Sequence, residues 1–280
     1  MPTSIHNALS HSMPMRDSTP MSTVTKTERT HPYPRLIAHR GAGTLAPENT
    51  LSAFRLGAEF GFTMFECDAK LSKDQVLFLH HDDLLDRTTN GRGTAGNFTW
   101  QTLSTLDAGC WHSAHFTGEP LMRLRSLIDF CLANQFFLNI EIKPSPGEAY
   151  ATGHAVATLL QKFTDAFTPV NPFLLSSFEP DALRAVCDVD PSLPRALLLD
   201  AWHDEAYAFL EKNGCSGLIT NFEIMTPEIV AHCHQHNRFV MVYTANAPYD
   251  IERLLGMGVD SVITDNMSIL HEIEVGTNGD

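Results

Sequence analysis

The alternation of short apolar runs with longer helical patterns constrains this chain most strongly, and it begins at Arg35. Nine short runs are rich in branched and aromatic residues, as buried strands are. They span residues 35–40, 63–70, 76–81, 136–143, 173–178, 195–200, 217–222, 239–244 and 260–265. Helical patterns separate most of them, at residues 49–61, 125–135, 155–167, 181–189, 205–214, 227–236 and 250–258. This alternation predicts βα units built on a parallel sheet.

One connection is too short for a parallel crossover. Residues 63–70 and 76–81 are joined only by the turn LSKDQ, whereas a parallel crossover needs about a dozen residues or more. These two runs must therefore form an antiparallel hairpin. The other eight strands are then parallel, and eight βα units predict a (β/α)8 TIM barrel with a hairpin after its second strand.

Two stretches depart from the alternation. Residues 1–33 are rich in Ser, Thr, Pro and Met and have no apolar period, so we expect a disordered N-terminal tail. Residues 34–280 are then one barrel domain. Arg87–Leu124 is rich in Gly and Thr and too long for an ordinary loop, so we expect a small insertion on the catalytic face of the barrel.

The charge balance narrows the range of partners. The chain has 33 acidic and 19 basic residues, a formal net charge of −14, which disfavours nucleic acid and anionic membranes. No apolar run approaches the roughly 18 residues of a membrane-spanning helix, so we expect no stable membrane association. The 6 cysteines include no CxxC pair and show no disulfide framework, which predicts a cytoplasmic protein. The oligomeric state is not indicated.

Three carboxylates stand at the ends of predicted barrel strands, where the active sites of such barrels lie. Glu66 and Asp68 are two residues apart and so share one face of a strand, and Glu141 ends the next barrel strand. Three anions at one barrel mouth repel one another unless a cation joins them. Oxygen-only ligands select a hard ion, so the sequence predicts one divalent cation, Mg²⁺ or Ca²⁺. The alternative is a structural ion network with Arg40 and Lys143.

Histidines flank this cluster. His39 ends the first strand, and His80 and His81 end the return strand of the hairpin. Two histidines at one rim can act as general acid and general base, but alternation sends His80 and His81 to opposite faces, so only one of them can be catalytic. Arg40 and Lys143 supply positive charge that would hold a phosphate beside the cation. Together these groups indicate phosphodiester cleavage.

Three other features are tempting but are expected to have no catalytic role. The run His232-Cys233-His234-Gln235-His236 lies at a helix end, where residues two apart do not share a face. Lys70 and Lys73, near the hairpin tip, are expected to be solvated. Asp265 follows the last strand, and we expect it to orient neighbouring loops rather than to react.

The chain resembles the glycerophosphodiester phosphodiesterase family, and the match is closest to its small cytosolic bacterial type. The segments that carry the resemblance are AHRGAGTLAPENTLSAF, FECDAKLSKDQ, HDDLLDRTTNGRG, LDAGCW, NIEIKP, LLSSF, LLLD, YTAN and GVDSVITD, in the order of the family. The resemblance implies a hydrolase that converts small diesters, such as glycerophosphocholine or glycerophosphoethanolamine, to sn-glycerol 3-phosphate and an alcohol. It also implies that the insertion forms the glycerol side of the site.

The family also implies roles for particular residues. A divalent metal ion would bind Glu66, Asp68 and Glu141, and the register of HDDLLDRTTNG selects His81 as the partner of His39. The other residues that the resemblance assigns are Arg40 and Lys143 near the phosphate, with Glu48 and Asn49 in support. Which histidine is the acid stays open, as does the choice between attack by water and attack by the substrate's own 2-hydroxyl.

The sequence departs from the family pattern without removing a predicted catalytic group. Met122-Arg123 replaces a usual proline, Cys67 separates the first two acidic residues, and Tyr243 stands where many members have tryptophan. The last of these bears on substrate identity. Two other functions remain as alternatives. A related phospholipase would need an apolar or basic rim, and a non-catalytic barrel would be favoured if Glu66 or either histidine were absent.

Overall fold

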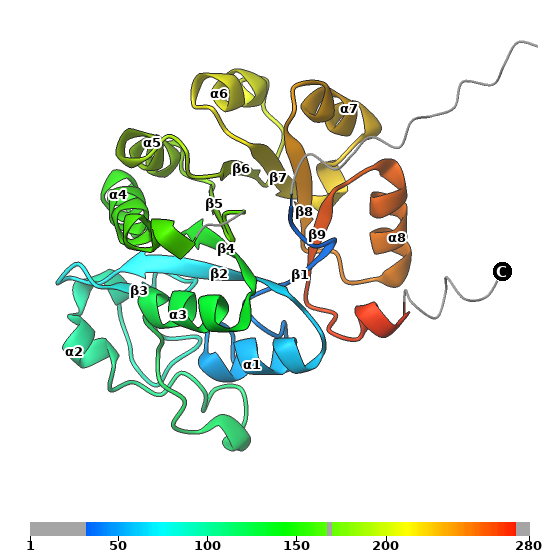
Figure 1. The fold of residues 1–280 in the computed structure, drawn as a ribbon. Coiled ribbons are helices and arrows are strands. Elements are labelled where there is room, and N and C mark those ends of the chain that lie inside the picture. Colours follow the sequence, from blue (N-terminus) through cyan, green and yellow to red (C-terminus); the bar gives the residue numbers. More distant parts are fainter. Residues whose placement is uncertain (1–31, 167–169, 273–280) are drawn as a thin grey trace, which may run out of the picture.

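Nine strands form a single closed sheet in the computed structural model, which describes residues 32–166 and 170–272 (Figure 1). Eight of them are parallel in the order β1-β9-β8-β7-β6-β5-β4-β2, and pairing of β1 with β2 closes the ring. The strands are β1 (Leu36–Ala38), β2 (Met64–Leu71), β3 (Leu77–Leu79), β4 (Phe137–Ile142), β5 (Phe173–Ser177), β6 (Arg195–Leu199), β7 (Gly217–Asn221), β8 (Phe239–Tyr243) and β9 (Ser261–Thr264). The predicted TIM barrel is confirmed.

The predicted hairpin is confirmed as well. Strand β3 pairs antiparallel with β2, with Ala69 opposite Leu79, and it lies outside the ring of parallel strands. The backbone N–H of His80 continues this ladder by donating to the carbonyl of Asp68. The hairpin therefore brings the end of β3 back to the level of the β2 carboxylates.

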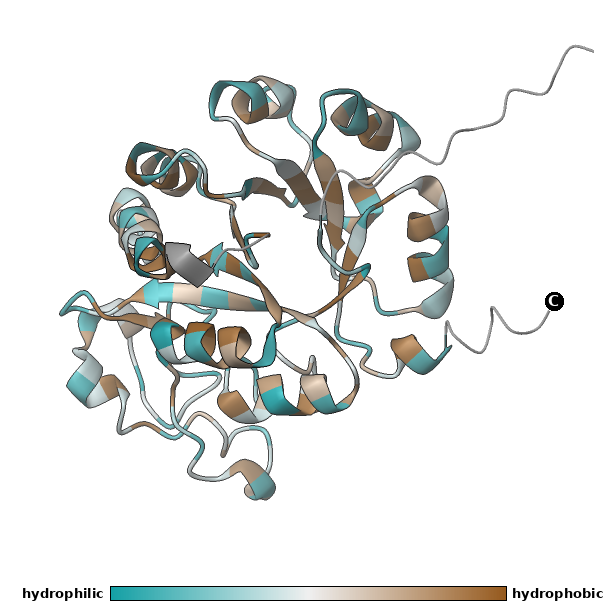
Figure 2. Cartoon of the chain, viewed as in Figure 1, coloured by the Kyte–Doolittle hydropathy of each residue, from teal (hydrophilic) through white to brown (hydrophobic). Residues whose placement is uncertain are grey.

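The barrel helices lie around the outside of the ring (Figure 1). They are α1 (Leu51–Glu59), α3 (Leu124–Asn134), α4 (Ala149–Leu160), α5 (Pro180–Val189), α6 (Ala206–Lys212), α7 (Pro227–Gln235) and α8 (Pro248–Met257). The side chain of Thr50 caps α1 and that of Thr226 caps α7, while α5, α7 and α8 begin with proline, whose fixed φ suits the first turn. Their apolar residues face the sheet and their polar residues face outward (Figure 2).

Alternate residues of each strand point into the barrel, and these inward positions change from apolar to polar along the strands. The lower layer is an apolar cluster that includes Ile37, Met64, Leu174, Met241 and Ile263. Two residues further along, the same inward register reaches the mouth. The residues at that level are His39, Glu66, Ser176, Tyr243 and Asp265. The register that packs the core therefore also places the polar side chains at the C-terminal mouth.

The insertion has a small core of its own. It contains α2 (Trp100–Leu103) and the 3₁₀ helices η1 (Ala95–Asn97) and η2 (Ala114–Phe116), and its core is formed by Phe78, Leu85, Ala95, Leu103, Ala108 and Leu121. The carboxylate of Glu119 accepts hydrogen bonds from the backbone N–H and hydroxyl of Ser52, at the start of α1. His112 Nε2 lies 3.0 Å from the carbonyl of Thr44. The insertion thus packs against the β1–α1 connection, beside the mouth.

Two predictions concern the edges of the barrel: the N-terminal tail and the lysines near the hairpin tip. The predicted tail, residues 1–33, lies outside the described residues up to residue 31, but Tyr33 is buried and its ring packs edge-on against Phe137 and Phe239. Lys70 was expected to be solvated, and this is wrong. Its side chain is fully buried under the insertion side of β2, and Nζ lies 3.3 Å from Asp83. Lys73 is exposed as expected.

The remaining 3₁₀ helices, η3 (Gln161–Ala166) and η4 (Phe222–Ile224), only extend connections. All six cysteines are free, which agrees with the expected lack of a disulfide framework. Among the described residues, no helix is both long and apolar enough to cross a membrane.

Candidate active site

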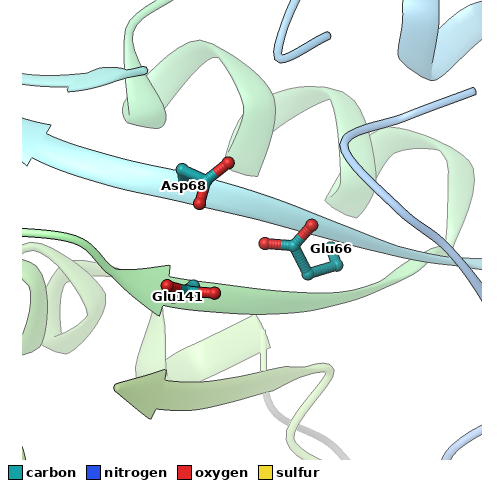
Figure 3. Close-up of side chains that lie close together, drawn as sticks. All are labelled: Glu66, Asp68 and Glu141. Carbon is teal, nitrogen blue, oxygen red and sulfur yellow. The ribbon is translucent and has the colours of Figure 1, made fainter. Parts of the chain in front are cut away.

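The three predicted carboxylates converge at the mouth of the barrel (Figure 3). Glu66 and Asp68 come from β2 and Glu141 from β4, where Asp68 and Glu141 are directly paired positions. Each offers an oxygen within 4.8 Å of the others. Glu66 Oε1 and Asp68 Oδ1 are buried and have no hydrogen-bond partner, which is the state expected of oxygens that bind a cation. We call these three residues the carboxylate triad.

The electrostatics of the triad also favour a cation. Burial and the charges of Asp68 and Glu141 raise the pKa of Glu66 well above its usual value. Burial and Asp68 also raise the pKa of Glu141. For Asp68, burial acts in the same direction, but Arg40, His81 and Lys143 outweigh it and lower its pKa to about 2. The ionised forms of Glu66 and Glu141 are therefore destabilised by their carboxylate neighbours, and a divalent ion would offset this repulsion.

The β1–α1 turn supports the triad through an unusual backbone. Arg40 and Asn49 have φ values of 51° and 60°, a region that costs energy for residues other than glycine. In this conformation the Arg40 N–H donates to Glu66 Oε2 over 3.1 Å. Asn49 donates from Nδ2 to Asp68 Oδ2 and accepts from the Asp68 N–H. These bonds leave the other oxygen of each carboxylate free and fix its direction.

The two positively charged side chains predicted at the site, Arg40 and Lys143, both pair with carboxylates. Lys143 Nζ donates to Glu141 Oε1 over 2.8 Å, and Arg40 Nη1 donates to Glu48 Oε1 over 2.9 Å. Arg40 Nε also lies 3.3 Å from Asp68 Oδ2. Burial alone would lower the pKa of Lys143, but the nearby carboxylates outweigh it and raise the pKa, so this side chain is charged. Both positively charged side chains therefore stand beside the triad.

Each candidate histidine is held by an aspartate at Nδ1. His39 Nδ1 lies 2.7 Å from Asp265 Oδ1, and His81 Nδ1 lies 2.7 Å from Asp82 Oδ1. Because a carboxylate can only accept, Nδ1 carries the proton in each ring and Nε2 is left for the cavity. Asp265 itself is held by Asn246. Its structural role is therefore more specific than the loop-orienting role expected from the sequence.

Arg87 lies beside the site and is not predicted from the sequence, where it only begins the insertion. It donates to both oxygens of Asp82 over 2.7 and 2.8 Å and to both oxygens of Glu48 over 2.7 and 2.8 Å. These bonds hold the pKa of Asp82 well below its usual value. Arg87 thus connects Asp82, which holds His81, to Glu48, which binds Arg40. Its place in the HDDLLDRTTNG motif, among residues already singled out, was the available signal.

Replacement of Arg87 by alanine is expected to lower kcat about 10- to 100-fold with a smaller change in KM, because residues that orient catalytic groups have effects of this size. Arg87→Lys is expected to recover only part of the loss, since an ammonium cannot bind two carboxylates in a bidentate manner. Steady-state kinetics with thermal unfolding of each variant measures this. Arg92→Ala, at an exposed arginine of the same insertion, is the matched control. Equal kinetics for the two alanine variants would contradict the role of Arg87.

A cavity of about 260 Å³ opens over these groups. Its lining residues are His39, Arg40, Glu66, His81, Asn139, Glu141, Lys143, Phe178, Leu198, Asp200, Tyr243, Thr244 and Ile263. The cavity thus includes His81, whereas His80 is turned away, with Nε2 3.0 Å from the carbonyl of Leu84. Asn139, which sequence reasoning also missed, is buried with Oδ1 unpaired. No residue of the insertion lines this cavity, and Arg87 connects the insertion to it by donating to Asp82, the partner of His81.

The histidine run of α7 does not form a second metal site in the described part of the chain. His232 stacks on Tyr207 and His236, and His234 Nε2 lies 2.9 Å from Asp260. Among the described residues, the carboxylate triad is the cluster that could hold a metal ion.

The fold and this mouth define a TIM-barrel enzyme of the hydrolase class, with an acidic cluster that could bind a divalent ion and two histidines beside it. The chain belongs to the glycerophosphoryl diester phosphodiesterase family, whose model matches residues 39–269. A glycerophosphodiester phosphodiesterase of Caldanaerobacter subterraneus is 32% identical over 84% of this chain and 95% of its own length. One from Bacillus subtilis is 28% identical over 92% of each chain.

A solved structure shares the fold in detail. It is an Oleispira antarctica phosphodiesterase in complex with the product sn-glycerol-3-phosphate, and it matches with a TM-score of 0.80 and 29% identity over 86% of this chain and 97% of its own. The family resemblance predicted from the sequence motifs is therefore confirmed.

Proposed function

We propose that this chain hydrolyses glycerophosphodiesters to sn-glycerol 3-phosphate and an alcohol, with one divalent cation, Mg²⁺ or Ca²⁺, and with His39 and His81 as the acid-base pair. The observation that carries the proposal is one cavity lined by two aspartate-held histidines and by Glu66 and Glu141 of the carboxylate triad. Family membership and the product named for the Oleispira structure support the substrate class.

The residues present fit a hard cation. Glu66, Asp68 and Glu141 supply only oxygen, and two of the buried carboxylate oxygens have no partner. When bound, the ion would neutralise the triad and stabilise negative charge on a phosphate beside it. Arg40 and Lys143 would attract and orient the phosphate, and Glu48 and Asn49 would hold Arg40 and Asp68 in place.

The histidines would move the protons. Burial lowers the pKa of His81 below its ordinary value, so its ring is neutral at neutral pH and Nε2 can accept a proton. That makes His81 the better candidate for the base and leaves His39 to protonate the leaving oxygen. Asp82 and Asp265 would keep both rings in the required orientation throughout. The nucleophile is either water or the substrate's glycerol 2-hydroxyl.

The test is release of glycerol 3-phosphate from glycerophosphocholine and glycerophosphoethanolamine, with Mg²⁺ or Ca²⁺ and after chelation by EDTA. Activity is expected with the ion, to disappear with EDTA and to return when excess ion is added, because the triad loses its charge balance without it. Turnover untouched by chelation would contradict the metal proposal. Failure to cleave either diester would contradict the function itself.

Lysophosphatidylcholine tests the phospholipase alternative in the same assay. We expect it to be a poor substrate, since the proposed substrates are small and diffusible and the chain is strongly acidic. Preference for the lysolipid would favour the phospholipase instead. A cytoplasmic location and a disordered segment before the barrel domain remain proposals from the sequence.

A further inference from the structure

We propose that Phe178, Asp200 and Tyr243 form a subsite for a positively charged alcohol group, so that the preferred substrates are diesters of ammonium alcohols such as choline and ethanolamine. This inference rests on the proposed function, because it requires the phosphate to lie at the carboxylate triad. We call these three residues the ammonium wall.

Asp200 and Tyr243 of the ammonium wall stand across the mouth from Glu141 and the β1 end, and Phe178 connects them to the triad side, where its ring lies beside Lys143. Phe178 follows β5, Asp200 follows β6 and Tyr243 ends β8, and all three continue the inward register of their strands. In the order of the closed sheet, β8 lies opposite β4, β6 lies opposite β1, and β5 is the neighbour of β4. The same cavity of about 260 Å³ touches both sides. A diester with its phosphate at the triad can therefore extend one arm to the wall.

Asp200 brings negative charge that the protein leaves largely uncompensated. Its carboxylate is exposed and accepts two long hydrogen bonds, 3.3 Å from Asn221 Nδ2 and 3.4 Å from the Tyr243 hydroxyl. The Tyr243 hydroxyl has one proton, and its shorter contact is 3.1 Å to the carbonyl of Leu199. Within the described part of the chain, no lysine or arginine pairs with Asp200. A ligand cation would supply the missing partner.

The two aromatic rings make this wall suitable for an ammonium group. Phe178 and Tyr243 meet edge to face, with centroids 5.7 Å apart and an interplanar angle of 87°. Lys143 Nζ stands 5.1 Å from the centroid of Phe178, so that ring already pairs with a cation of the triad side, and the ring beside Asp200 is that of Tyr243. Ring faces beside a carboxylate are the chemistry by which proteins bind ammonium ligands.

The charges of the cavity match a zwitterionic diester. Lys143 and Arg40 stand on the triad side, where a phosphate would lie, and the charge of the opposite wall is the carboxylate of Asp200. A substrate with a negative phosphate and a positive ammonium group is attracted by both sides of the cavity. A substrate with a neutral alcohol is attracted only by Lys143 and Arg40, through its phosphate. The wall therefore predicts discrimination by the charge of the alcohol rather than by its size.

The experiment compares kcat/KM for glycerophosphocholine with that for glycerophosphoglycerol, whose alcohol is neutral. Wild-type enzyme is expected to prefer the choline diester, and Asp200→Asn to lower the ratio of the two values about tenfold, within the range of a partly desolvated cation site. Tyr243→Leu is expected to lower the ratio as well, and Tyr243→Phe to restore it because the ring is kept.

Asp204→Asn is the matched control, since Asp204 is an exposed carboxylate on the loop that follows the same strand. It is expected to leave the ratio unchanged, whereas a general effect of net charge would lower it in both variants. An unchanged ratio in Asp200→Asn overturns the subsite. This includes an equal loss of kcat/KM for both substrates, which would show that Asp200 holds the glycerol that they share. Wild-type enzyme that cleaves neither diester would instead count against the proposed function.

Discussion

Replacement of His39 or His81 by alanine is expected to lower kcat by about 10²–10⁴-fold, the usual contribution of a positioned general acid or base. Each ring stands beside the carboxylate triad with Nε2 available, and the other nitrogen is held by an aspartate. KM is expected to change less, because the rings would act on protons in the transition state more than on the bound ground state. Initial rates with glycerophosphocholine measure the effect.

Two matched variants make the result specific. His203→Ala removes an exposed histidine from a loop on the same face and is expected to keep full activity. Asp265→Asn is expected to lower kcat less than His39→Ala and to add little in the double variant, because it acts through His39. Near-wild-type turnover of His39→Ala or His81→Ala would falsify the acid-base assignment.

Replacement of Glu66 by glutamine is expected to have opposite effects on activity and stability. Loss of a metal ligand and its charge should lower kcat/KM by on the order of 10³-fold, since a bound metal contributes several kcal/mol to charge stabilisation. The metal-free protein should become more stable at neutral pH. Burial and the charges of Asp68 and Glu141 raise the pKa of Glu66 in the folded protein, so the fold loses stability as the pH rises from the ordinary pKa of a glutamate toward the raised one.

Thermal unfolding with EDTA, Mg²⁺ or Ca²⁺ separates the two effects. In EDTA the Glu66→Gln variant should melt above the wild type, by about 2–4 °C for each kcal/mol gained. Added ion should raise the melting temperature of the wild type and leave that of the variant almost unchanged. Glu211→Gln, at an exposed position on α6, should change neither. A variant that melts lower in EDTA and still responds to the ion contradicts this account of the triad.

The barrel and most of the side chains at its mouth could be predicted from the sequence because both follow from strand periodicity. Inward positions alternate along each strand, so the residues two beyond Ile37 and Met64 had to be His39 and Glu66 at the mouth. The short LSKDQ turn required the hairpin, which brought His80 and His81 to the level of Asp68, and the family motif then selected His81. Sequence patterns were sufficient here because residues close together in the chain determine these positions.

The failures have a common cause in contacts between distant segments. Lys70 looks like a hairpin-tip residue, but the insertion packs over β2 and buries it against Asp83. Arg87 looks like a loop residue, and its bonds to Glu48 depend on how the insertion docks beside the β1–α1 turn. Pairing of Asp265 with His39 joins the last strand to the first. No local pattern specifies these distances.

By itself the sequence determined the barrel, through the alternation of strands and helices and the length of each connection. It also determined the inward register and therefore the set of side chains at the mouth, since these depend on a period of two within one strand. Only the tertiary structure decided which groups pair there. Closure of β1 onto β9 and β2 brings Asp265 to His39, and the ring of strands sets Tyr243 opposite Glu141 and Asp200 opposite the β1 end. Pairing energies depend on distances of a few ångströms across the barrel, and these are fixed by the packing of the whole sheet.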